Sequence, residues 1–409
     1  MPVNSSHKIT KYPKYALSDI KNPTFISFLD LSRWLAAAVV FIGHLRAPLF
    51  LGYSDVPVLD QTILVKLWYF VTGLHMEAVI VFFVLSGYLV GGISCAKINS
   101  GRYRPDVFAI DRVTRLYVAF LPAVFLTYFL DMAGSYFFGE VGFWNHSHPM
   151  IVQKANTLFS FDSNLSIQTL LGNIGMLQGF AVRPVGSNQP FWTISMEFWF
   201  YIFFGLIAAA WITSGNLKKV LVIGASLMLV LLLGNMFLLY MGIWFIGVLL
   251  AFIPSYIRMY SSFTLFIFLL VLALVRLNHD MINHDVSYRM AKNYIVAISF
   301  GLLLVSMRNK STFFLLKMAK INRSLADFSY SLYLIHFPLM IFLLAGIFAT
   351  GAFHEISQGY VPTNGEGVIL YVGIIIVVYS LAWLFSRATE AQTWRLRKYL
   401  KRKLISRLQ

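Results

Sequence analysis

Long runs of apolar residues, separated by short polar segments, recur along the whole of this 409-residue chain. A membrane-spanning helix needs about 20 consecutive apolar residues, whereas the strands of a membrane barrel alternate over about ten. The runs therefore predict an all-α fold, a polytopic transmembrane helical bundle of about ten spans. The expected spans are residues 27–47, 76–96, 115–138, 191–212, 219–234, 236–256, 261–277, 293–307, 326–349 and 366–386.

Three segments depart from this simple alternation. The fifth and sixth spans meet at Gly234-Asn235, where we expect the helix to break. Residues 62–72 are apolar but too short to cross, so we expect them to lie at the interface or to re-enter the membrane. The longest loop, 139–190, is polar and rich in aromatic residues, and loops of this length are often functional.

The distribution of Lys and Arg predicts that both termini lie in the cytoplasm. With ten spans and the N-terminus inside, the inside segments carry 25 of these residues and the outside loops carry 7. On this basis residues 1–24 form a cytoplasmic tail without a cleavable signal, 25–388 the transmembrane domain and 389–409 a basic cytoplasmic tail. We expect the basic helix between Arg395 and Arg407 to contact anionic membrane lipid.

The composition agrees with this reading, since 58% of the residues are hydrophobic and only 12% are charged. A net charge of +16 would suggest nucleic acid as the partner of a soluble protein, but here the basic residues follow the orientation of the spans. We therefore expect no nucleic-acid partner. The single Cys95 excludes a disulfide framework and a cysteine-based metal site, and we expect no metal.

The first span keeps three polar residues, Asp30, Arg33 and His44. Arg33 and His44 are eleven residues apart, which places them on one helix face, roughly 16 Å apart along the axis. An ionisable residue inside a span usually signals function, and neutral imidazole suits the removal of a proton from a hydroxyl. The alternative is that Asp30 and Arg33 form an internal ion pair and that His44 lies at the interface.

Two arginines, Arg112 and Arg115, share one helix face before the third span, with Tyr117 beside them. Guanidinium groups are well suited to phosphate, so the segment predicts a dock for a polyanionic cytoplasmic cofactor. An ordinary basic cytoplasmic loop is the alternative.

The other polar positions lie within or beside spans. Ser86-Gly87 allows close helix packing. His75 and Glu77 flank the outer end of the second span, where they either face the same vestibule as His44 or simply lie at the interface. Trp192 and Glu197 open the fourth span, where a carboxylate is costly unless paired. His336 lies in a run of Ser and Tyr that can line a polar seam, and a satisfied interior histidine is the alternative.

Together these stretches resemble the acyltransferase-3 family, the bacterial integral-membrane enzymes that O-acylate surface polysaccharides and related glycans. The resemblance rests on Arg33 and His44 in the first span, FFVLSGYL at 82–89, the Arg112 and Arg115 pair, FWTISMEFWFY at 191–201 and SYSLYLIHFP at 329–338. They occur in the order of the family over roughly residues 25–400. Arg387-Ala-Thr-Glu390 resembles its closing turn loosely, and Glu197-Phe198 replaces its usual paired glutamates.

The resemblance implies acetyl-CoA as donor, a sugar hydroxyl of a surface or lipid-linked polysaccharide as acceptor, and a location in the bacterial cytoplasmic membrane. His44 would act as the general base, either for direct transfer or through an acetyl-histidine. The resemblance leaves the oligomeric state open. The expected catalytic residues are His44, Arg33, Glu197 and Ser86; those binding the donor are Arg112, Arg115, Arg33 and Tyr117; and those on the acceptor side are His75, Glu77, Trp192 and His336.

Two other classes of membrane protein compete with this interpretation. A transporter or flippase for a lipid-linked glycan would also have many spans and buried charges, but the chain shows no inverted repeat. A membrane O-acyltransferase that modifies lipids or proteins also uses an intramembrane histidine, without the Arg33 and His44 pattern of the first span.

Overall fold

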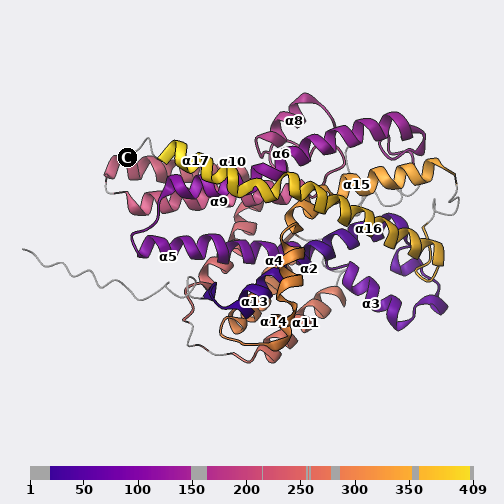
Figure 1. Cartoon of the computed structure of the whole chain (residues 1–409), viewed down its shortest axis with the longest axis horizontal. Helices are drawn as coiled ribbons and strands as arrows, with labels where there is room; N and C mark the ends of the chain where they lie inside the picture. Colours follow the sequence, from indigo (N-terminus) through magenta and orange to yellow (C-terminus); the bar gives the residue numbers. More distant parts are fainter. Residues whose placement is uncertain are drawn as a thin grey trace, which may run out of the picture. The chain divides into compact units, whose positions relative to one another are not determined.

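The computed structural model describes residues 19–148, 164–213, 215–254, 257, 259–277, 286–351 and 359–405 (Figure 1). Within these ranges the chain is helical, and it contains no β-strand beyond isolated bridges such as Phe50 to Tyr360. The expected all-α fold is confirmed. The main helices are α2 (Pro23–Leu49), α3 (Ile63–Thr72), α4 (His75–Ser86), the π-helical η3 (Gly87–Gly92), α5 (Ile93–Asn99), α6 (Pro105–Phe138), α8 (Ile167–Ile174), α9 (Phe191–Ile212), α10 (Asn216–Leu250), α11 (Ser261–Leu277), α13 (Val286–Met307), α14 (Phe313–Ala326), α15 (Ser329–Ala349), α16 (Gly365–Ala388) and α17 (Thr393–Ile405).

Eight helices in the described ranges are long and apolar enough to cross a membrane. Two features account for the difference from ten. Two of the expected spans form α10, whose backbone breaks at Gly234 with a φ of 76°, where the Gly-Asn junction predicted it. Helix α11 has 17 residues, fewer than the about 20 that a span needs. The segment expected to be too short to cross is α3, a helix of 10 residues.

The chain divides into two compact units, which we describe separately. Unit 1 comprises the described residues within Met1–Asp30, Ile80–Phe108 and Ile202–Ile321, and unit 2 comprises those within Leu31–Val79, Ala109–Tyr201 and Asn322–Gln409.

In unit 1, η3 packs closely against α10. A Cβ atom at Gly87 would overlap the carbonyl oxygen of Trp244, so only glycine allows this approach. The indole of Trp244 donates a hydrogen bond to Ser86 Oγ at 3.1 Å. The end of α10 is closed by Arg308, whose guanidinium donates to the carbonyls of Leu250 and Ile253. Leu250 is the last residue of α10, and its carbonyl also accepts the backbone N–H of Ile253 at 3.2 Å, so the buried arginine adds a second donor at this helix end.

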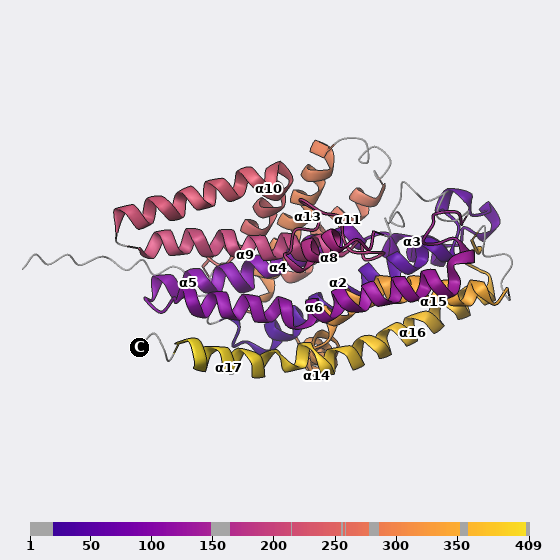
Figure 2. The ribbon, with the colours of Figure 1, turned by 90° about the horizontal axis from the view of Figure 1, so that it is seen from above.

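Unit 2 contains the whole of α15, most of α2 and α6, the first half of α9, and the pair α16 and α17. Figures 1 and 2 show α17 continuing the course of α16 after the short turn Glu390–Gln392. Helix α17 is held on α6 by Asp111, whose carboxylate pairs with Arg397 at 3.2 Å and with Lys401 at 2.7 Å. The basic helix expected at the C-terminus is therefore confirmed as a helix.

Candidate functional site

Unit 2 holds every expected site residue except one. Ser86 belongs to unit 1, where its hydroxyl accepts the hydrogen bond from Trp244 that supports helix packing. The residues in unit 2 are Arg33, His44, His75, Glu77, Arg112, Arg115, Tyr117, Trp192, Glu197 and His336.

Two histidines from distant parts of the sequence meet inside unit 2. Nδ1 of His44 on α2 lies 2.9 Å from Nε2 of His336 on α15, and the two imidazole planes are 6° apart. Both side chains are buried, with 8% of His44 and none of His336 exposed. His336 is thus a direct hydrogen-bond partner of His44, and its expected role on the acceptor side stays a prediction.

Helix α2 carries His44 close to the turn between α3 and α4. A Cβ atom at Gly43 would overlap the carbonyl oxygen of Thr72, so the absence of a side chain lets this turn approach. The His75 ring consequently lies 5.8 Å from the His44 ring, centroid to centroid. Glu77 follows on α4 and is buried. The structure therefore brings His75 to His44, as the sequence suggested.

Hydrogen bonds join α15 to the start of α9, and one of them depends on a proline in α15. Pro338 has no N–H, so the carbonyl of Leu334, four residues earlier, lacks its helical partner. Asn188 Nδ2 donates to this carbonyl at 2.8 Å. One residue before Leu334, the hydroxyl of Tyr333 lies 2.7 Å from Thr193 Oγ1. The two motifs at 191–201 and 329–338 are therefore joined by hydrogen bonds, and Trp192, which is partly exposed, precedes Thr193.

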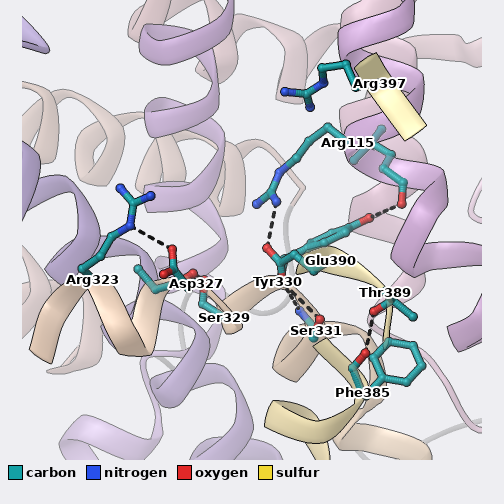
Figure 3. A network of polar contacts seen from close by, with 12 residues as sticks. Arg115, Arg323, Asp327, Ser329, Tyr330, Ser331, Phe385, Thr389, Glu390 and Arg397 are labelled. Carbon is teal, nitrogen blue, oxygen red and sulfur yellow. Dashed lines mark hydrogen bonds and ion pairs between the residues drawn. The ribbon is translucent and has the colours of Figure 1, made fainter. Parts of the chain in front are cut away.

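At the N-terminal end of α15, Arg115 is paired with a carboxylate. Its Nη1 lies 2.8 Å from Glu390 Oε1, and its guanidinium lies 5.2 Å from the centre of the Tyr330 ring (Figure 3). Glu390 also accepts hydrogen bonds from Ser331, at 3.2 Å from the backbone N and 3.0 Å from Oγ. The charge of Arg115, which we expected to face phosphate, is therefore already balanced. Glu390 was suggested only by its loose resemblance to a closing turn.

The neighbouring Arg112 lies over an aromatic ring. Its guanidinium is 5.7 Å from the centre of the Tyr201 ring, and the hydroxyl of Tyr201 donates to Glu197 one turn earlier on α9. Glu197 is therefore paired, as the cost of a carboxylate in a span requires. Tyr117, expected beside the donor, donates its hydroxyl to the carbonyl of Ile174 on α8 at 3.1 Å.

The polar positions of α15 connect these two regions along one helix. Tyr330 and Ser331 lie at the Arg115 end, and His336 lies about 7.5–9 Å further along the axis. On α2, Arg33 and His44 remain about three turns apart, as the sequence spacing predicted. Unit 2 thus carries a histidine pair and an arginine-rich cluster at separate levels.

The comparison with protein families places the chain among known proteins. The model of the family described as Acyltransferase domain, acyltransferase-3, matches residues 26–387. No curated protein and no solved structure matches the chain. Since the family match covers nearly the whole chain and the described part holds eight helices able to cross a membrane, the protein belongs to the acyltransferase-3 family and is a multi-pass membrane acyltransferase.

Proposed function

We propose that the protein is an O-acetyltransferase that moves an acetyl group from acetyl-CoA to a sugar hydroxyl of a surface or lipid-linked polysaccharide. The observation that carries this proposal is the buried pair of His44 and His336 in unit 2, with His75 beside it. A paired imidazole in a water-poor interior is suited to general-base chemistry on a hydroxyl.

The arginine cluster supports an anionic donor. Arg112 and Arg115 present planar cations of the kind that bind phosphates, and Arg33 lies on the helix that leads to His44. Arg115 is held by Glu390 at 2.8 Å, so binding of the donor would exchange one anion for another at this guanidinium. With the N-terminus inside, as the distribution of Lys and Arg predicts, the donor would enter from the cytoplasm.

The transfer follows from general-base catalysis at His44. The imidazole takes the proton of the acceptor hydroxyl while the hydroxyl oxygen forms a bond to the acetyl carbonyl carbon. The carbon–sulfur bond then breaks, and the imidazolium returns the proton to the departing sulfur. The products are the acetyl ester and the free thiol. In the alternative route His44 first accepts the acetyl group itself and passes it to the hydroxyl.

The remaining expected residues complete the proposal. His75 and Glu77 adjoin His44 and would face the acceptor together with Trp192, while Arg33 and Glu197 would orient the donor. Ser86 supports helix packing in unit 1, and we assign it no further role. We place the protein in the bacterial cytoplasmic membrane, with anionic lipid as the partner of α17.

The test compares glycans from cells that carry wild-type protein, His44→Ala or the control His148→Ala. We expect the mass of one acetyl group per modified unit to disappear with His44→Ala alone, while all three proteins accumulate in the membrane. Normal acetylation by His44→Ala would show that His44 is not the base. Loss of exported glycan without a change in acetylation would instead indicate transport.

A further inference from the structure

We infer that His336 is a positioning residue: it holds neutral His44 in the tautomer whose Nε2 is unprotonated, so that Nε2 is the atom that takes the proton of the acceptor hydroxyl. This inference rests on the proposed function, because it specifies which nitrogen of His44 acts. A chain of hydrogen bonds runs from the backbone of α15 through His336 to His44.

The backbone of α15 determines where His336 carries its proton. Nδ1 of His336 lies 2.8 Å from the carbonyl oxygen of Tyr333 and 3.1 Å from that of Leu332. A carbonyl oxygen can only accept a hydrogen bond, so Nδ1 is the donor and carries the hydrogen. In a neutral imidazole the other nitrogen then has a lone pair. Nε2 of His336 is therefore an acceptor.

This acceptor determines the tautomer of His44. Nδ1 of His44 lies 2.9 Å from Nε2 of His336, and a hydrogen bond at this distance needs one donor and one acceptor. Since Nε2 of His336 accepts, Nδ1 of His44 donates and carries the hydrogen. The lone pair of neutral His44 is then on Nε2, which makes no hydrogen bond to any described residue.

Aromatic neighbours hold the two rings in this arrangement. Phe337 lies edge-on to His44, with 5.3 Å between the ring centroids, and Phe41 lies edge-on to His336 at 5.7 Å. The nearly coplanar rings leave no room for water between the two nitrogens, which are in direct contact. A free neutral imidazole exchanges between its two tautomers, whereas His44 is restricted to one.

The neutral partner also determines where the proton goes after it is taken. Because Nδ1 of His336 already carries a hydrogen, transfer of the Nδ1 proton of His44 to Nε2 of His336 would only move the positive charge to the second imidazole, and the new proton would remain on Nε2 of His44. The proton taken up at Nε2 therefore stays on His44. From there it passes to the departing sulfur, so the same nitrogen acts first as base and then as acid.

The experiment reads the tautomer directly and the rate separately. Protein labelled with ¹⁵N-histidine and held in detergent reports which ring nitrogens carry hydrogen, and the signals of His44 are assigned through His44→Ala. We expect hydrogen on Nδ1 and none on Nε2. His336→Gln keeps an acceptor oxygen for His44 and a donor for the α15 carbonyls, so it should retain the tautomer and a kcat within about tenfold of wild type.

His336→Phe keeps an aromatic ring but removes the acceptor. We expect the single tautomer to be lost, with kcat about 100-fold lower and KM nearly unchanged. His148→Phe is the matched control, because His148 also packs against an aromatic ring, that of Phe348 at 5.5 Å. Burial lowers the pKa of its imidazole below the ordinary value. The His148→Phe variant should leave kcat unchanged.

Two results would overturn the positioning role. One is hydrogen on Nε2 of His44 in the wild type, and the other is an unchanged kcat in folded His336→Phe. Because His336 is buried, folding of each variant is checked by gel filtration, and the glutamine variant gives a second measurement. A wild-type protein without transferase activity would contradict the proposed function. The measured tautomer of His44 would still show whether its Nδ1 donates the hydrogen bond to His336.

Discussion

Replacing Glu390 with glutamine removes a charge from the arginine cluster while keeping the size of the side chain and one carbonyl oxygen. The carboxylate makes an ion pair with Arg115 and two hydrogen bonds to Ser331. If Arg115 binds the donor phosphates, Glu390 competes with them. Glu390→Gln should therefore lower the stability of the protein and raise its affinity for acetyl-CoA.

The exposure of the two side chains determines the size of the stability change. Removing one partner of a buried ion pair costs about 3–5 kcal/mol, whereas an exposed pair contributes about 0–1 kcal/mol. Glu390 is 6% exposed and Arg115 is 31% exposed, so this pair lies between the two limits. Glutamine retains an acceptor for Ser331. We therefore expect a loss of about 1–2 kcal/mol.

The affinity change follows from the same contact. In the wild type, donor binding must displace or share the carboxylate that lies 2.8 Å from Arg115. With a neutral amide in place of the carboxylate, this cost falls. We expect an affinity for acetyl-CoA about 3- to 10-fold higher, which corresponds to roughly 0.7–1.4 kcal/mol of binding free energy. Arg115→Gln should lower stability in the same way but weaken binding, because the cation itself is lost.

Thermal unfolding in detergent measures the stability change, and titration calorimetry with acetyl-CoA measures the affinity change. Asp106→Asn is the control, since the Arg104–Asp106 pair has the same 2.7–2.8 Å geometry but exposes 44% and 32% of its side chains. It should change neither quantity. Weaker or unchanged acetyl-CoA binding by folded Glu390→Gln would refute the competition between carboxylate and phosphate at Arg115.

Two further predictions concern other parts of the chain. Asn188→Ala should lower the free energy of unfolding by about 1–3 kcal/mol, because the Leu334 carbonyl loses its donor. Adding Pro338→Ala should recover part of this loss by restoring a backbone N–H. Thermal unfolding of the single and double variants measures both changes, and losses that simply add would contradict the prediction. Replacing the exposed basic residues of α17 with glutamine should reduce the anionic lipid retained by purified protein, as measured by mass spectrometry. An equal loss of lipid after replacing a control set of exposed lysines outside α17 would contradict a specific role of α17. The α17 set is Arg395, Lys398, Arg402 and Lys403, and the control set is Lys218, Lys219, Lys317 and Lys320.

Much of the fold could be predicted because spans leave a local signal. The apolar runs predicted the helices, and the expected boundary between two spans at Gly234-Asn235 coincides with the break in α10, since both signals depend on neighbouring residues alone. The apolar run of α11 suggested a span as readily as the others, although the helix has 17 residues. The three-turn separation of Arg33 and His44 also followed from helix geometry.

The partners within the site could not be predicted in this way. His44 and His336 are 292 residues apart, and Arg115 and Glu390 are 275 apart. Helical spacing shows which residues share a face of one helix, but it does not show which helices pack together. The sequence therefore singled out His336 as a polar residue in a seam without indicating that it contacts His44. The hydrogen bond from Asn188 to Leu334 is equally non-local, since it joins residues 146 apart in the sequence.

Helix α15 holds Ser331, the partner of Glu390, and His336, the partner of His44, within a single rigid segment. Each residue added to a helix rotates everything after it by about 100°. One insertion between Ser331 and His336 would therefore turn the imidazole away from His44, even if every side chain of the two clusters were kept. The five-residue interval between them is a requirement in its own right, and a search for proteins with the same site should demand it as strictly as the histidines themselves.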